Sequence, residues 1–124
     1  MQQILIIDDE KAILDVLRLA LTRVGCEVEI AANGHQGIQK FDNGHFDVVI
    51  TDIFMPGLNG NSVAQHIRNS NRPSTPIIGF SGTPWLLQEG DFDMVFTKPF
   101  PLKDLMNAVQ DFSKKSSEPR RASL

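Results

Sequence analysis

The sequence predicts an α/β domain of the doubly wound class, in which helices cover both faces of a five-stranded parallel sheet. Short apolar runs of strand length alternate along the chain with longer segments whose apolar residues recur at helical spacing. This alternation repeats five times within 124 residues, a length that suits one domain. Strands that are joined through helices pair in parallel, because a helical crossover returns the chain to the same end of the sheet.

The expected strands are short and mostly apolar. Four of them end directly at a charged or hydroxyl residue, at Asp8, Asp52, Ser81 and Lys98. A continuous apolar run of this length is typical of a strand that is buried on both faces. The five predicted strands are residues 3–7, 28–31, 46–51, 77–80 and 94–97.

The expected helices follow the strands in turn. The first covers the apolar positions of 13–24 and ends before Gly25, a residue suited to the positive φ of a helix C-terminus. A short helix is expected near 36–41, and apolar positions within 63–67 mark one face of a third. The last helix begins at Pro101, since proline is favoured in a first helical turn, and it carries one apolar stripe.

Composition and charge exclude several classes of function. The formal net charge is −3, and residues 114–124 are basic, which leaves an acidic body. An acidic body disfavours nucleic-acid binding, whose affinity comes largely from Lys and Arg. No apolar run has the length of a membrane helix, and the chain enters its first strand without a basic leader. We therefore expect a cytoplasmic protein without membrane or nucleic-acid contacts, in which the single cysteine, Cys26, is a small buried hydrophobe.

Five polar residues stand where apolar strands end. Asp8 and Asp9 follow the first strand, and Asp52 follows the third. Ser81 and Lys98 follow the fourth and the fifth. In a parallel sheet these ends share one edge, and ligands of doubly wound domains bind there. Any one of the five alone would be interpreted as a loop residue or a helix cap, but their joint occurrence predicts a binding site.

The predicted cluster has the chemistry of a phosphoryl site. Three carboxylates held together repel one another, and a divalent cation between them would remove that repulsion. Oxygen ligands without His or Cys favour Mg²⁺ over zinc, and Mg²⁺ often works beside a substrate phosphate. The Lys98 ammonium can pair with a phosphoryl oxygen or a carboxylate, and the Ser81 hydroxyl can donate to a phosphoryl oxygen. Asp52 comes from the middle strand of the set, so it is the predicted nucleophile.

Four short motifs occur in order at these strand ends. They are Asp-Asp-Glu at 8–10, Asp-Ile-Phe-Met-Pro-Gly at 52–57, Ser-Gly at 81–82 and Thr-Lys-Pro-Phe at 97–100. In order and spacing they resemble the receiver domain of response regulators in two-component, or phosphorelay, signal transduction. The resemblance covers about residues 2–115 and implies a flavodoxin-like sheet with strand order 2-1-3-4-5. It divides the chain into a receiver domain, 1–115, and a flexible tail or linker start, 116–124.

The resemblance implies a role for each carboxylate. Asp52 would accept a phosphoryl group from a phosphohistidine of a histidine kinase or a histidine phosphotransfer protein. Asp9 would bind Mg²⁺ directly and Asp8 mostly through water, while Asp52 and the backbone carbonyl of Phe54 complete the protein ligands. Beyond taking up and losing its own phosphoryl group, the chain is not expected to be an enzyme.

The resemblance also implies a switch. Ser81 would hydrogen-bond the phosphoryl group and move toward it, and Lys98 would form an ion pair with it. The Lys98–Pro99 peptide bond is expected to be cis. The change would alter a protein contact surface that is read by an unknown output protein or output domain, or through a phosphorylation-dependent homodimer.

The chain departs from the family pattern in two places. The family commonly has an aromatic residue three positions before the lysine, where this chain has Val95, and Phe96 follows on the opposite face of the strand. The stretch after Ser81 is also short, which leaves residues 83–90 room for barely two turns of a shortened fourth helix. Trp85 in that stretch is expected either to cover the core or to contact a partner. The predicted switch and output residues are Ser81, Val95, Trp85 and Phe96.

Two alternatives stay open at this point. A pseudo-receiver would bind partners independently of phosphorylation. The complete set of polar residues argues against it, while the two departures keep it open. A Mg²⁺-dependent phosphohydrolase would use Asp52 as nucleophile and a carboxylate two residues later as general acid, where the chain has Phe54. The bulky Phe54 is instead expected to hinder water at an acyl phosphate and to prolong its lifetime.

Overall fold

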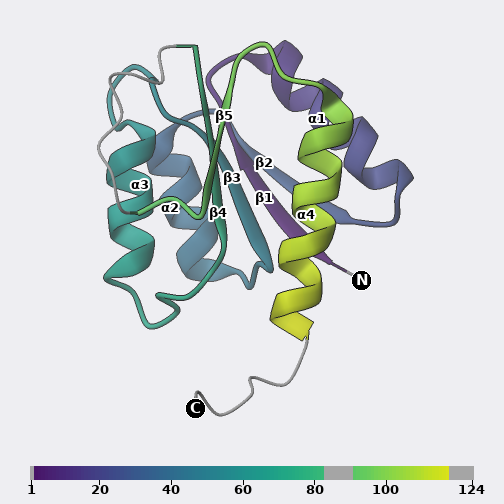
Figure 1. The fold of residues 1–124 in the computed structure, drawn as a ribbon. Helices are drawn as coiled ribbons and strands as arrows, with labels where there is room; N and C mark the ends of the chain where they lie inside the picture. Colours follow the sequence, from purple (N-terminus) through teal and green to yellow (C-terminus); the bar gives the residue numbers. More distant parts are fainter. Residues whose placement is uncertain (1, 83–90, 118–124) are drawn as a thin grey trace.

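The computed structural model describes residues 2–82 and 91–117, and within them it contains one parallel sheet. Neighbouring strands follow the order β2-β1-β3-β4-β5, and every pair is parallel. The predicted class and strand order are therefore confirmed (Figure 1). The strands are β1 (Gln3–Ile7), β2 (Glu27–Ala31), β3 (Val48–Asp52), β4 (Ile77–Ser81) and β5 (Met94–Thr97).

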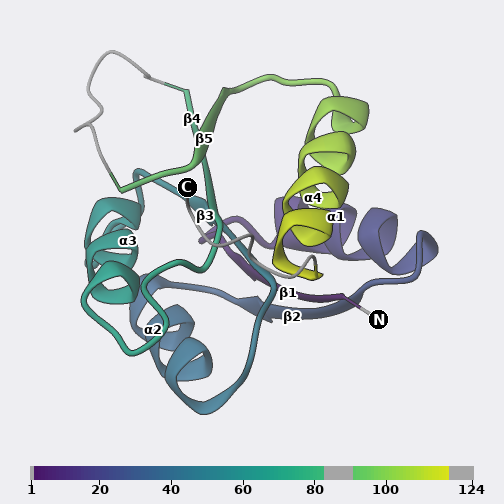
Figure 2. The ribbon, with the colours of Figure 1, turned by 60° about the horizontal axis from the view of Figure 1, so that its bottom comes forward.

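Helices cover both faces of the sheet. Two of them, α1 and α4, lie on one face, and α2 and α3 lie on the other (Figure 2). The described helices are α1 (Lys11–Arg23), α2 (Gly34–Asn43), α3 (Gly60–Arg68) and α4 (Leu102–Ser117). The helix labelled α4 is the last helix of the sequence prediction, and the predicted fourth helix, with Trp85, lies outside the described residues.

Two apolar clusters, one on each face, hold the layers together. Alternate residues of a strand point to opposite faces, so Ile4 and Ile6 of β1 join the cluster under α1 and α4. Leu5 and Ile7 join the cluster under α2 and α3. All four are fully buried, which explains why the strand is a continuous apolar run rather than an alternating one. Cys26 is buried within the cluster under α1 and α4, which we call the first cluster, as predicted.

Local contacts set the helix ends, some of which differ from the sequence prediction. The structure starts α2 at Gly34, because the Asn33 side chain accepts a hydrogen bond from the Gln36 backbone N–H at 2.9 Å and caps the helix. Gly25 has φ of 92° just after α1, as its predicted place at a helix C-terminus requires. The last helix runs to Ser117, two residues beyond the expected end of the receiver domain.

Candidate functional site

Three carboxylates meet at the carboxyl edge of the sheet, as the strand topology predicts. Asp8 and Asp9 follow β1, Asp52 is the last residue of β3, and β1 and β3 are adjacent in the sheet. One carboxylate oxygen from each of the three lies within 4.8 Å of the others. Asp8 and Asp52 are buried, whereas Asp9 is exposed to solvent.

The backbone around Asp8 fixes its carboxylate at the turn from β1 into α1. Its N–H donates to the Ala31 carbonyl at 3.1 Å, which extends the pairing with β2 by one residue. Its Oδ1 accepts a hydrogen bond from the Glu10 N–H at 2.8 Å, a side-chain contact typical of aspartate at a turn. The other oxygen, Oδ2, is therefore free to face the remaining carboxylates.

Lys98 lies across the site from the three acids. Its Nζ is 3.5 Å from Asp52 Oδ2 and 3.8 Å from Asp8 Oδ2. Its backbone N–H donates to the Ser81 carbonyl at 2.8 Å, so the ends of β4 and β5 are tied together there. The Lys98–Pro99 peptide bond is cis, as expected. All five polar residues singled out in the sequence thus lie at the same edge of the sheet.

The two buried carboxylates are costly to ionise. Burial raises the pKa of Asp8 to about 6, although the hydrogen bond from Glu10 N–H opposes the change and the negative Asp52 adds to it. Burial also raises the pKa of Asp52, against the opposing positive charge of Lys98. A divalent cation would relieve this strain by supplying positive charge between the acids.

One buried oxygen tests whether a cation fits. Asp8 Oδ2 is inaccessible to water and has no hydrogen-bond partner in the described part of the chain, and the Lys98 ammonium is 3.8 Å away. A buried polar oxygen without a partner is expensive, and coordination to a metal or to its water would satisfy it. The set of three carboxylates around this oxygen suits Mg²⁺, which prefers oxygen ligands.

Glycine lets the loop after β3 return close to Asp52. The Gly60 N–H donates to the Ile53 carbonyl at 2.8 Å, and a Cβ added at Gly60 would overlap the Asp52 carbonyl oxygen. The Thr51 hydroxyl donates to the Asp52 carbonyl at 2.9 Å. Sequence analysis did not identify Gly60 as part of the site, because the close approach appears only once β3 and α3 are packed together.

The predicted switch residues are spread over different surroundings. Ser81 is fully buried at the end of β4. Val95 is 37% exposed, while Phe96 packs against the first cluster with its ring centroid 5.4 Å from that of Phe100. The predicted placement of Val95 and Phe96 on opposite faces thus agrees with their contacts. Phe54, whose carbonyl is a predicted metal ligand, has an exposed side chain.

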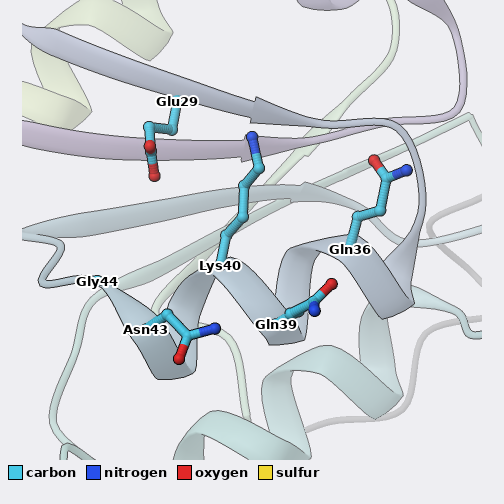
Figure 3. A pocket seen from close by; sticks show the side chains of 6 residues that line it. All are labelled: Glu29, Gln36, Gln39, Lys40, Asn43 and Gly44. Carbon is cyan, nitrogen blue, oxygen red and sulfur yellow. The ribbon is translucent and has the colours of Figure 1, made fainter.

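A second hollow is polar but lacks the features of this site. It lies between β2 and α2 and contains none of the predicted site residues (Figure 3). The Lys40 ammonium in it donates to the Ile30 carbonyl at 2.7 Å, so its charge is used within the fold. Glu29 supplies one carboxylate, whereas the site at the sheet edge brings three together.

The fold and the acidic pocket together are those of a signalling receiver. The family model for the response regulator receiver domain matches residues 4–110. The chain therefore belongs to the response regulator receiver family. The structure of the receiver domain of the sensor histidine kinase PA1611 from Pseudomonas aeruginosa, which is 25% identical to this chain with a TM-score of 0.84, holds a magnesium ion in its active-site cleft. Among the described residues, no helix has both the length and the apolar character needed to cross a membrane.

Several relatives show how far the similarity extends. The uncharacterized transcriptional regulatory protein YrkP of Bacillus subtilis is 39% identical over 110 residues, which are 83% of this chain and 46% of YrkP. Protein PilG of Pseudomonas aeruginosa is 31% identical, over 87% of this chain and 84% of PilG. Among solved structures, the Thermotoga maritima response regulator TrrA in complex with Mg²⁺ and BeF superposes with a TM-score of 0.82. Its sequence is 33% identical, and the match covers 90% of this chain and 99% of TrrA. The chain spans about half the length of several curated relatives, including the transcriptional regulatory protein TrcR of Mycobacterium tuberculosis.

Proposed function

We propose that this receiver takes a phosphoryl group onto Asp52 from a phosphohistidine of a histidine kinase or a histidine phosphotransfer protein. An Asp52 oxygen forms a bond to phosphorus while the phosphorus–nitrogen bond breaks, and the histidine nitrogen keeps the electron pair and takes up a proton. The observation that carries this proposal is the cluster of Asp8, Asp9 and Asp52 with the Lys98 ammonium 3.5 Å from Asp52 Oδ2.

The surrounding residues divide the remaining tasks. Asp8, Asp9, Asp52 and the Phe54 carbonyl would hold Mg²⁺, which supplies positive charge that offsets the charge of the phosphoryl oxygens. Lys98 would exchange its contact with Asp52 for an ion pair to the phosphoryl group. The buried Ser81 would donate its hydroxyl proton to another phosphoryl oxygen.

The output of the proposed receiver is a changed contact with another protein. Phosphorylation adds negative charge and strong hydrogen-bond acceptors, and Ser81 and Lys98 can move to contact them. Such local changes shift the population of a two-state surface. Phe96 joins the core beside Phe100, so we expect it to respond through packing, while the half-exposed Val95 would meet a partner directly. The partner, a phosphorylation-dependent homodimer and a cytoplasmic location stay predictions.

Removing the metal is expected to stop the reaction. The protein incubated with acetyl phosphate and Mg²⁺ should gain one phosphoryl group, and the same mixture with excess EDTA should gain almost none, because the acids then repel the incoming phosphoryl oxygens. Intact-mass spectrometry measures the adduct. Replacing Mg²⁺ by an equal ionic strength of Na⁺ controls for salt. Equal adduct formation with and without Mg²⁺ would contradict the assigned role of the carboxylates.

Phe54→Asn is expected to shorten the lifetime of the phosphoryl group several-fold. Phe54 follows Asp52 by two residues and its side chain is 41% exposed, and we expect an apolar ring there to hinder the approach of water to the acyl phosphate. An amide would instead hold a water molecule near it. The decay of the adduct after removal of acetyl phosphate measures the lifetime, and Phe54→Leu serves as an apolar control. A Phe54→Asn variant that decays no faster than the wild type would refute the role of the ring.

A further inference from the structure

Among the described residues, two carboxylates and one aromatic ring contact the ammonium group of Lys98. Besides the two carboxylate oxygens at 3.5 and 3.8 Å, the centroid of the Phe80 ring lies 4.8 Å from Nζ. Both carboxylate distances exceed the 2.7–3.2 Å that is usual for N–H···O hydrogen bonds. The distance to the ring is within the range in which an aromatic face attracts a cation. The ring is thus a third contact of the ammonium, beside the two ion pairs.

The Phe80 ring is itself held firmly. Phe80 is fully buried in β4, where it pairs with Asp52 on one side and with Phe96 on the other. Its carbonyl accepts a hydrogen bond from the Ile53 N–H at 3.1 Å. Its ring packs on that of Phe100, with centroids 5.8 Å apart and planes tilted by 57°. The sheet thus fixes the position of the ring relative to Asp52.

Strand alternation places the ring and the acids on the same face. Asp8, Asp52 and Phe80 each follow by two residues an isoleucine of the cluster under α1 and α4. Lys98 follows Phe96 by two residues in the same way, and Phe96 packs against that cluster. The ammonium thus contacts the Phe80 ring of β4 as well as the carboxylates that follow β1 and β3.

An apolar groove borders the ring and the lysine. Its volume is about 540 Å³, and Phe80, Lys98 and Phe100 line it together with apolar residues of α1. Lys98 supplies the one charge among the described residues that line this groove. Among the surfaces of this groove, the negative face of the Phe80 ring attracts an ammonium.

We propose that Phe80 is a positioning residue for Lys98, whose ring face keeps the ammonium beside Asp52 and ready to pair with a phosphoryl oxygen. The inference rests on the proposed role of Asp52 as phosphoryl acceptor. Phe80 acts through Lys98, since the lysine is the group that would touch the phosphoryl oxygens. An aromatic ring at position 80 thereby contributes to the rate of phosphorylation as well as to the core.

Graded fluorination of the ring tests this role at nearly constant shape. Phenylalanine with one, two or three ring fluorines at position 80 carries progressively less negative charge on its face. We expect the rate of phosphorylation by acetyl phosphate at saturating Mg²⁺ to fall stepwise, by roughly three- to five-fold with three fluorines. The affinity for Mg²⁺, measured separately, should change by less than about two-fold because the carboxylates are untouched. A second readout is the upfield ring-current shift of the Lys98 side-chain proton resonances, which Phe80→Leu should remove.

The chain offers a matched control in Phe41. This residue is fully buried on the other face of the sheet, and the Arg72 guanidinium lies over its ring at 4.4 Å from the centroid. The same fluorination at position 41 weakens a cation–aromatic contact of the same kind away from the site. It should lower the free energy of unfolding and leave the phosphorylation rate unchanged.

Each outcome separates this inference from the proposed function. An adduct on the wild-type protein together with an unchanged rate on fluorination of Phe80 would overturn the role of Phe80 alone. Equal losses of rate at positions 80 and 41 would also overturn it, because they would reflect a general loss of stability. If the wild-type protein forms no Mg²⁺-dependent adduct while the ring-current shift is present, the proposed function fails, and the role of Phe80 in phosphorylation fails with it.

Discussion

Asp52→Asn is expected to abolish the phosphoryl adduct, lowering its rate of formation to less than about one hundredth of the wild-type rate. The substitution keeps the size of the side chain and one oxygen near Lys98, but an amide oxygen is a poor nucleophile and carries no charge. Because burial already raises the pKa of Asp52, a neutral residue suits this position, and the variant should fold. Intact-mass spectrometry after incubation with acetyl phosphate and Mg²⁺ measures the loss.

The control for this variant is an exposed aspartate on the first helix. Asp15→Asn makes the same chemical change on the surface of α1, and it should leave adduct formation as in the wild-type protein. Peptide mapping of the adduct distinguishes the acceptor from its neighbours, since oxygens of Asp8, Asp9 and Asp52 lie within 4.8 Å of one another. A full adduct on Asp52→Asn, or one that maps to Asp8 or Asp9 in the wild-type protein, would overturn the choice of nucleophile.

Much of this site could be predicted because sheet topology converts sequence position into spatial position. Asp8 and Asp52 lie 44 residues apart in the chain, yet both follow apolar runs that form neighbouring parallel strands. Strand-end residues of a parallel sheet share an edge regardless of what the helices between them contain. The apolar runs of β1 and β3 were long enough to identify both strands, so the convergence of the acids followed.

The parts that could not be predicted depend on side-chain contacts between elements. The ring of Phe80 lies under Lys98 only because β4 and β5 pair in one register, and a phenylalanine in a buried strand ordinarily indicates core packing. The approach of Gly60 to the Asp52 carbonyl likewise needs α3 to be in place. The start of α2 was missed because Gly34 is a weak helix former, and the capping contact of Asn33 decides the boundary.

Asp8→Asn is expected to stabilise the metal-free protein at neutral pH. With the pKa of Asp8 raised to about 6 in the folded state and about 3.9 in an unfolded chain, the folded state binds the proton more tightly. The free energy of unfolding of the metal-free protein therefore falls as pH rises from about 4 to above 6, and the full penalty is present at pH 7.5. The Asn side chain can keep the hydrogen bond that Oδ1 accepts from the Glu10 N–H, while the charge is removed.

Denaturation with urea in the presence of EDTA measures this effect. At pH 7.5 the free energy of unfolding of Asp8→Asn should exceed that of the wild-type protein by about 2 kcal/mol, and near pH 4 the difference should largely vanish. Asp15→Asn, at an exposed position, is the control and should show no comparable gain at pH 7.5. If Asp8→Asn instead lowered the free energy of unfolding equally at both pH values, the Asp8 carboxylate would stabilise the fold and the prediction would be wrong.

Mg²⁺ should reverse the order of the two proteins. Binding to the folded state alone stabilises the wild-type protein by an amount that grows with the logarithm of the metal concentration, and the cation offsets the repulsion among Asp8, Asp9 and Asp52. In Asp8→Asn one carboxylate is gone and an amide NH2 group, which cannot bind a cation, takes the place of the buried Oδ2, so Mg²⁺ should stabilise this variant much less. The stability that the metal-free protein loses at Asp8 is thus the same electrostatic energy that would favour a cation at this edge of the sheet.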